Sequence, residues 1–422
     1  MNESENQFYD VIVVGAGPAG SACALLLAKK GRRVLLLDKS TFPRDKVCGD
    51  AHSGKTIAVI REAGLLDEMQ KLQHAKVKGL TMVAPNNTKV TVPYPDAQGL
   101  DCAGYVVKRI EADNLLFKAA HENKYITVIE GFTVSGLLKD TNENIYGVSG
   151  LLAKNDGTAE ELSFKSRVVV GADGFGSTVA NCLGLPLAPK NHTAVAVRGY
   201  WKNVSDLSQN IELYFTEGVL PGYFWIFPLE NNEANVGLGM VTSDVLERKI
   251  NPVKLLEETI KSHPLISPRF KNATLEGKIG AWNIPYGSFK RKNFGDGWIL
   301  VGDAAHLVDP FSGEGIANAV TSAKFAAETI DTAITECGNS TEPISAKYLK
   351  PYSDMIDKYL RHELELSYLI QRVSRIKFLL NMFITKAATK PEFRQILTDM
   401  LANEETKKQI RSPLFYLKLL LP

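Results

Sequence analysis

Gly302 and Asp303 are the residues whose types and positions best suit ligand binding. They follow the apolar run 298–301 and precede a helix of small residues predicted from 315 to about 329. A strand that leads through a glycine turn to a helix N-terminus attracts an anion, because backbone N–H groups and the helix dipole point toward it. The aspartate can accept a hydrogen bond from a sugar-like hydroxyl. The loop residues expected to contact the ligand are Gly302, Asp303, Gly313, Gly315 and Ile316.

A second glycine-rich loop lies near the start of the chain, where 15–20 reads GAGPAG. An apolar strand at 11–14 precedes it, a helix is predicted from 21 to about 30, and a strand at 34–37 ends at Asp38. This order is the fingerprint of a dinucleotide-binding βαβ unit, whose glycines admit a pyrophosphate and whose acidic residue binds a ribose. The residues predicted to bind the dinucleotide are Gly15, Gly17, Ala19, Gly20, Asp38 and Lys39.

A third turn of this kind follows the apolar strand predicted at 168–170 and contains Asp173 and Gly174. Glycine at such a turn lets a planar ligand come close to the backbone. Three such turns, in the first, middle and last parts of one chain, predict a single extended ligand that all three loops contact.

With these motifs the chain resembles the flavoproteins of the glutathione-reductase-type FAD fold, in their p-hydroxybenzoate-hydroxylase-like branch. The resemblance implies that the first loop binds the FAD pyrophosphate, that the turn at 173–174 lies near the cofactor and a nicotinamide donor, and that the turn at 302–303 binds the ribityl chain. Arg109, with Asp113 in the segment RIEADNLLFKAA, is similar to a family arginine that approaches the FAD.

Two segments resemble the geranylgeranyl reductase family within that branch. The sequence 42–49, FPRDKVCG, is similar to its PRxKxCG segment, and 223–228, YFWIFP, is similar to its YxWxFP segment. The resemblance implies an FAD-dependent oxidoreductase that reduces C=C bonds of a polyprenyl lipid, quinone or pigment chain. Electrons would come from NAD(P)H or a small reduced carrier. Three positions depart from the family pattern: Asp38 replaces glutamate, Ala180 replaces arginine and Ala51 replaces glycine.

The aromatic segment suits an isoprenoid substrate. Tyr223, Trp225 and Phe227 alternate along a predicted strand, so they share one face. An isolated C=C bond is unpolarised, and its reduction needs a proton and stabilisation of cationic character on carbon. An aromatic face can stabilise a cation by about 0.5–2 kcal/mol. The alternative is that these rings are ordinary sheet core.

Cys48 is the candidate proton donor or redox-active group, because Arg44 and Lys46 lie close in sequence and cations lower the pKa of a thiol. A buried, inert cysteine is the alternative. Arg44 and Lys46 are also expected to meet a phosphate of FAD, of a prenyl diphosphate or of a phospholipid head group, unless they are solvated surface charges. His306, which follows the turn at 302–303, is expected to be structural. His52 lies near Cys48 in the sequence, but its spacing assigns it no role.

Three other functions stay open. The first two are a flavin-dependent monooxygenase, such as an aromatic hydroxylase, and a flavin halogenase, whose WxWxIP segment is close to 223–228. Both would consume oxygen. The third is a flavin- and lipid-binding protein without turnover.

Composition limits these alternatives. The chain has 422 residues, a length that suggests two or three domains, and its 45% hydrophobic content can fill a sizeable core. A net charge of +2 argues against a nucleic-acid partner. The five cysteines show no zinc-type spacing, so no metal site is predicted and reduced thiols in the cytoplasm are expected. The leader lacks the basic region of a signal peptide.

The predicted fold class is α/β: a Rossmann-like FAD-binding domain with an inserted, mostly antiparallel β-sheet substrate domain and a C-terminal helical region. We assign 8–75, 103–185 and 280–335 to the discontinuous FAD domain, 76–102 and 186–279 to the sheet domain, and 336–422 to the helices. Asn231 and Asn232 are predicted to form a hairpin turn. Asn251 and Pro252 are predicted to begin a helix.

The C-terminal region differs in charge from the rest. From Lys347 onward there are 14 Lys and Arg against 8 Asp and Glu, and the segment 413–422 is strongly apolar. Basic and apolar character together suit an anionic membrane interface, which predicts peripheral membrane contact. Helices that cap the protein's own cavity are the alternative, and we favour that interpretation.

Overall fold

The computed structural model describes residues 8–94, 102–154 and 156–402. Within them the largest sheet has eight strands, with the order β17-β18-β11-β1-β2-β8, and the antiparallel strands β10 and β9 extend it from β11. Strands β11, β1, β2, β8 and β18 run parallel. The strand bounds are β1 Phe8–Val14, β2 Val34–Leu37, β8 Ile126–Ile129, β9 Phe132–Lys139, β10 Ile145–Ala153, β11 Ala159–Gly171, β17 Phe294–Gly295 and β18 Trp298–Leu300.

The parallel part of this sheet is its buried core. The residues 11–14 of β1 and all of β2 are buried, as expected where helices cover both faces of a parallel sheet. Helix α1 (Pro18–Lys29) begins within the first glycine loop, three residues earlier than predicted, with proline in its first turn. It packs against α4 (Arg109–His121) and α8 (Ile316–Cys337). The predicted βαβ unit is therefore present, and α8 runs further than the sequence indicated.

The second sheet has seven strands in the order β16-β12-β15-β14-β13-β5-β6. All neighbours are antiparallel except β13 and β5, so the predicted, mostly antiparallel sheet is confirmed. Asn231 and Asn232 form the turn between β14 and β15, both with φ of 57°. The bounds are β5 Gly79–Val83, β6 Lys89–Pro93, β12 Thr193–Lys202, β13 Asn210–Tyr214, β14 Tyr223–Pro228, β15 Ala234–Val241 and β16 Thr274–Pro285.

Short helices pack against the two large sheets, and three short strands form a separate sheet. Helix α7 (Pro252–Ser262) begins as predicted, because the Asn251 side chain accepts a hydrogen bond from the backbone N–H of Lys254. A small sheet has the order β3-β7-β4. The remaining bounds of this part are β3 Ala51–Ser53, β4 Ala75–Val77, β7 Gly104–Val106, α2 Gly54–Ala63, α3 Leu66–Lys71, α5 Thr178–Cys182 and α6 Thr242–Glu247.

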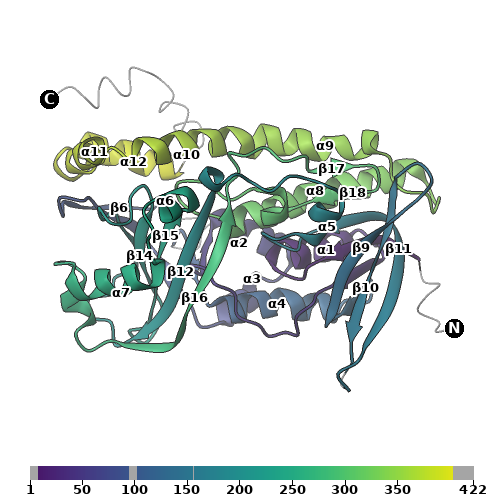
Figure 1. Ribbon diagram of the computed structural model, residues 1–422, viewed down its shortest axis with the longest axis horizontal. Helices are drawn as coiled ribbons and strands as arrows, with labels where there is room; N and C mark the ends of the chain where they lie inside the picture. The colour runs from purple at the N-terminus through teal and green to yellow at the C-terminus, as the bar shows by residue number, and fades with distance from the viewer. Residues whose placement is uncertain (1–7, 95–101, 155, 403–422) are drawn as a thin grey trace.

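The C-terminal helices follow one long edge of the molecule, and in Figure 1 they extend from beside α8 to beside β6 of the seven-stranded sheet. They are α9 Ala346–Ile356, α10 His362–Val373, α11 Lys377–Thr389 and α12 Pro391–Ala402, with a π-helical turn at Asp357–Arg361. None of the helices in the described ranges is long and apolar enough to cross a bilayer. The apolar segment predicted at 413–422 lies outside those ranges. The predicted fold class is confirmed.

Candidate functional site

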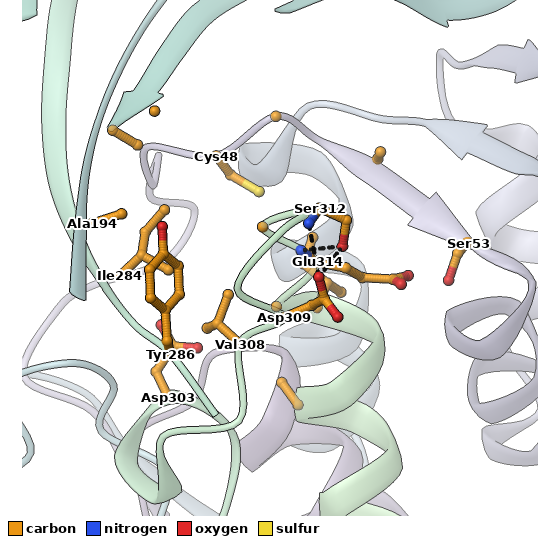
Figure 2. A pocket seen from close by; sticks show the side chains of 18 of the residues that line it. Cys48, Ser53, Ala194, Ile284, Tyr286, Asp303, Val308, Asp309, Ser312 and Glu314 are labelled. Atoms are coloured by element: carbon orange, nitrogen blue, oxygen red, sulfur yellow. Dashed lines mark hydrogen bonds between the residues drawn. The ribbon is translucent and has the colours of Figure 1, made fainter. Parts of the chain in front are cut away.

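One large cavity lies between the two main sheets and the C-terminal helices. Its volume is about 1670 Å³, and residues from all three predicted glycine turns line it together with the aromatic face of β14. The sequence prediction that these loops meet around one ligand agrees with this arrangement. Figure 2 shows part of the wall, where Cys48 faces the loop of Asp309, Ser312 and Glu314.

In the first glycine loop, position 15 must be glycine because the backbone there packs closely against the turn after β11. Gly15 has φ of 100°, and a Cβ built on it would lie 2.5 Å from the carbonyl oxygen of Ala172. Asp38 faces the same loop, because its Oδ2 accepts the Ala16 N–H at 2.7 Å and its Oδ1 accepts the Ser40 N–H at 2.8 Å. The carboxylate therefore fixes the loop, and both oxygens keep lone pairs for a ribose hydroxyl.

Arg109, Asp113 and Arg44 form a charged cluster at the cavity wall. Arg109 donates to both oxygens of Asp113, at 2.6 and 2.7 Å, and Arg44 donates to Oδ2 at 3.2 Å. The Asp113 side chain is completely buried. One carboxylate thus orients two arginines, and both of them line the cavity.

The turns at 173–174 and 302–303 each bring a half-buried carboxyl group to the cavity. Within the described part of the chain, Oδ1 of Asp173 is buried without a hydrogen-bond partner. Burial raises the pKa of Asp303, while Lys46 and Arg109 lower it. A buried, unpaired polar atom requires a partner. These groups, together with the glycine loop and the arginines, fit the hydroxyls and phosphates of an FAD.

The cavity gathers most, but not all, of the predicted site residues. Gly20 and Gly302 lie behind its surface, where they shape the turns and do not form the wall. The predicted residues that line it are Gly15, Gly17, Ala19, Asp38, Lys39, Arg44, Cys48, Arg109, Asp173, Gly174, Asp303, Gly313, Gly315, Ile316, Tyr223, Trp225 and Phe227.

Strand β14 presents its aromatic side chains as predicted. The ring centroids of Tyr223 and Trp225 are 6.2 Å apart, and those of Trp225 and Phe227 are 6.1 Å apart. All three rings line the cavity, whereas Phe224 is buried in the core on the other face. The Tyr223 hydroxyl donates to the carbonyl oxygen of Ser312. The three rings therefore form a cavity wall, which we call the aromatic wall.

Cys48 lines the cavity, but the expected lowering of its pKa is wrong. Burial raises the pKa of the thiol above its ordinary value of 9.0, and the charge of Arg109 opposes this effect. The sulfur accepts a hydrogen bond from the Asp50 N–H at 3.4 Å. The thiol therefore keeps its proton at neutral pH, which agrees with a proton donor better than with a thiolate.

Lys46 was expected as a cation near Cys48, but its burial and lowered pKa were not predicted from the sequence. Its Nζ lies 3.3 Å from the centroid of the Trp282 ring, and burial lowers the pKa of Lys46 to about 7, opposed by the charges of Asp303 and Cys48. The contact between Lys46 and Trp282 could be found only from the folded structure, because Trp282 lies on β16, far from Lys46 in the sequence.

The two histidines, His52 and His306, are both buried. Burial lowers the pKa of His52 to about 4 and that of His306 to about 3.

The sequence also did not indicate how far the cavity reaches. Beyond the aromatic wall it continues between the seven-stranded sheet and the C-terminal helices. The rings of Phe215 and Phe311 stack there, with centroids 6.0 Å apart. This apolar end, which we call the distal arm, is lined by Leu80, Met82, Phe215, Leu366, Ile370, Leu380, Met382, Phe383 and Ile384.

Comparison with known proteins agrees with this geometry. The sequence signature described as FAD binding domain matches residues 8–341. Menaquinone reductase of Mycobacterium tuberculosis is 34% identical over 330 residues, covering 76% of each chain. Digeranylgeranylglycerophospholipid reductase of Methanocaldococcus jannaschii is 34% identical over 375 residues, 87% of this chain and 88% of the relative. A geranylgeranyl bacteriochlorophyll reductase-like structure from Thermoplasma acidophilum has a TM-score of 0.79 at 25% identity, covering 91% of this chain and 92% of that one.

Proposed function

Because the chain belongs to the FAD-binding oxidoreductases, in their geranylgeranyl-reductase-like branch, we propose that it reduces C=C bonds in the polyprenyl chain of a lipid, quinone or pigment. The menaquinone reductase and the digeranylgeranylglycerophospholipid reductase described above are named for reduction of such compounds. The family resemblance predicted from the sequence is confirmed by this membership. The substrate and the roles of individual residues are our proposal.

The continuity of the cavity is the observation that carries this proposal. The residues that fit FAD, the aromatic wall and the distal arm line one space of about 1670 Å³. Apolar surface favours an oily ligand through the hydrophobic effect, by about 25 cal/mol for each Å² removed from water. A long isoprenoid chain fits such an arm, whereas a small aromatic substrate would leave it empty.

When bound, FAD supplies hydride transfer. The residues of the chain hold it: we propose that the loop 15–20 and Asp38 bind its adenosine diphosphate part, that Arg44 and Arg109 lie against it, and that the turns at 173–174 and 302–303 bind the rest. The cavity wall excludes water from the reacting bond.

Reduction of an unpolarised double bond also needs a proton and a site for positive charge. We propose that the faces of Tyr223 and Trp225 stabilise the developing cation, and that Phe227 positions the chain. Cys48 would donate the proton from Sγ, because its raised pKa keeps the thiol protonated. These three roles assign Cys48, Tyr223 and Trp225 as the catalytic residues.

The electron donor and the cellular site are further parts of the proposal. NAD(P)H or a small reduced carrier would deliver electrons in the cytoplasm. Peripheral membrane contact is supported by the corner between α10 and α11, where Leu369, Ile376 and Phe378 are 49%, 52% and 70% exposed. Ile370 and Leu379, next to them in sequence, line the cavity. A lipid-borne chain could therefore pass from the membrane into the distal arm at this corner.

Anaerobic stopped-flow spectroscopy tests the proposed function. Enzyme reduced with stoichiometric dithionite is mixed with a geranylgeranyl lipid that carries no quinone ring, and flavin absorbance is followed. Reoxidation without oxygen supports the reductase. Reoxidation that needs oxygen and passes through a flavin–oxygen adduct would instead indicate a monooxygenase or halogenase, and a flavin that stays reduced under both conditions would indicate a binding protein.

A further inference from the structure

A chain of buried hydrogen bonds connects Asp50 to the aromatic wall. Asp50 is completely buried, with φ of 65°, in the turn that follows Cys48. Its Oδ2 accepts a hydrogen bond from the Tyr200 hydroxyl and another from Nδ2 of Asn235, both at 2.7 Å. The Oδ1 of Asn235 accepts the indole N–H of Trp225 at 2.9 Å. None of Asp50, Tyr200 and Asn235 lines the cavity, so this chain lies behind its wall.

The donors and acceptors of this chain allow one orientation of the Asn235 amide. Its NH₂ group donates to Asp50 and also to the carbonyl oxygen of Cys48, at 2.7 Å. Its remaining oxygen must then face Trp225, whose indole nitrogen can only donate. A flipped amide would place two donors against each other, so Asp50 and Cys48 together determine which atom Trp225 meets.

The hydrogen bond to Asn235 and close packing against β15 hold the Trp225 ring in place. Trp225 pairs with Gly237 on β15, and a Cβ at Gly237 would lie 2.3 Å from the indole ring. The face of β15 that meets the Trp225 ring therefore carries Asn235, Gly237 and Gly239, whereas Val236 and Leu238 face the opposite core. Asn235 is the polar side chain that this face offers to the indole.

We propose that Asp50 is a positioning residue, which acts through Asn235 to set the plane of the Trp225 indole and the turn that carries Cys48. The inference rests on the proposed function, because that plane would decide which double bond of a prenyl chain lies beside the flavin. With a misoriented indole, the enzyme would reduce the wrong double bond or reduce the right one slowly. The alternative is that the network only stabilises the fold.

Several charged and titratable groups surround Asp50. Arg198 and Tyr200 approach from β12, Arg109 from α4, and Cys48 from the same turn. Burial raises the pKa of Asp50 to about 6, while Arg198, Asn235, Tyr200 and Arg109 lower it. The pKa of His52 is lowered to about 4 and that of Lys46 to about 7. Since Lys46 lies on Trp282, its titration should be recorded by a different tryptophan.

Fluorine NMR of FAD-bound protein labelled with fluorotryptophan tests the inference without substrate. The chain has four tryptophans, and Trp225→Phe identifies the resonance of Trp225. We expect that resonance to shift as the pH passes through about 6, where Asp50 has its pKa, while Trp201 and Trp298 serve as internal controls. Asp50→Asn keeps an acceptor for both donors but cannot ionise, so the resonance should stay near its wild-type position and lose its titration.

Two further variants complete the test. Asp50→Ala removes the acceptor and should displace the Trp225 resonance at every pH. If it does not fold, Asn235→Ser breaks the link while Asp50 remains, and the titration should disappear from Trp225. A titration that persists in Asp50→Asn, or a resonance unmoved in Asn235→Ser, would overturn the inference.

Kinetics then distinguishes positioning from mere stability. In Asp50→Ala or Asn235→Ser we expect kcat for chain reduction to fall and the order of bonds reduced to change, with KM nearly unchanged. Asp50→Asn should restore both. If the protein reduces no prenyl compound, the proposed function fails, while the NMR result still decides the role of Asp50.

Discussion

The carboxylate of Asp113 receives two hydrogen bonds from Arg109 and one from Arg44, although its side chain has no contact with solvent. Removing one partner from a buried ion pair leaves the other charge buried and unpaired, which costs about 3–5 kcal/mol. Asp113→Asn should therefore lower the free energy of unfolding by about that amount and weaken FAD retention. Denaturant unfolding and flavin content per chain measure the two effects.

The control for this prediction is an exposed pair on α9. Lys350 and Asp354 are 2.7 Å apart and about 60% exposed, and such pairs contribute about 0–1 kcal/mol. Asp354→Asn should leave both stability and flavin content near those of the wild type. Equal losses in the two variants would contradict a special role for the buried cluster.

The aromatic wall predicts a separation of binding from turnover. Trp225→Ala should retain FAD but lower kcat/KM for a prenyl substrate by about 2- to 30-fold, the equivalent of one cation–π contact of about 0.5–2 kcal/mol. Phe224→Leu alters the opposite face of the same strand and should leave kcat/KM near the wild-type value. Unaltered turnover in Trp225→Ala would remove the indole from the mechanism.

The thiol of Cys48 predicts a change in the pH–rate profile. Because burial raises its pKa above 9.0, the wild-type rate should fall at alkaline pH, where the thiol loses its proton. Cys48→Ala should be slower and lack this alkaline decline. Cys182→Ala is the matched control, since Cys182 is a free thiol outside the cavity wall. A profile in Cys48→Ala that matches the wild type would exclude the proton-donor role.

Burial of His306 predicts a loss of stability in acid. Its pKa falls from 6.5 to about 3 in the folded chain, so below pH 6.5 the unfolded chain binds the proton more readily. The free energy of unfolding should therefore fall as the pH decreases, by about 2 kcal/mol between pH 6.5 and about pH 5.

His306→Asn should remove this part of the pH dependence in denaturant unfolding. Asparagine tolerates the φ of 57° that His306 adopts. His121→Asn, on the exposed surface of α4, is the control and should keep the wild-type slope. An unchanged slope in His306→Asn would contradict the prediction.

The corner between α10 and α11 predicts binding to anionic vesicles. Burying a large apolar side chain contributes about 1.5–3 kcal/mol, so Phe378→Ser should weaken co-sedimentation with phosphatidylglycerol vesicles by about tenfold or more. Leu187→Ser is the control, because Leu187 is also exposed, at 61%, but lies on a different segment. Equal binding by the two variants would indicate that another surface contacts lipid.

Local sequence patterns predicted the parts of this fold that depend on neighbouring residues. The glycine loops, the alternation at 223–227 and the start of α7 at Asn251 are all set by short-range geometry. Asp50 and Asn235 could not be connected in this way, because 185 positions separate them and only the packed sheets bring them together. The predicted lowering of the Cys48 pKa was wrong for the same reason, since nearby cations can be identified in the sequence and burial cannot.

Turnover in heavy water without oxygen tests the central claim most directly. Enzyme, a reductant and a geranylgeranyl lipid or menaquinone are incubated, and the product is analysed by mass spectrometry. The account predicts a prenyl chain in which each reduced bond carries two deuterium atoms, and Trp225→Ala should form less of it. An unchanged chain without oxygen, together with an oxygenated or halogenated product once oxygen and halide are added, would contradict the account.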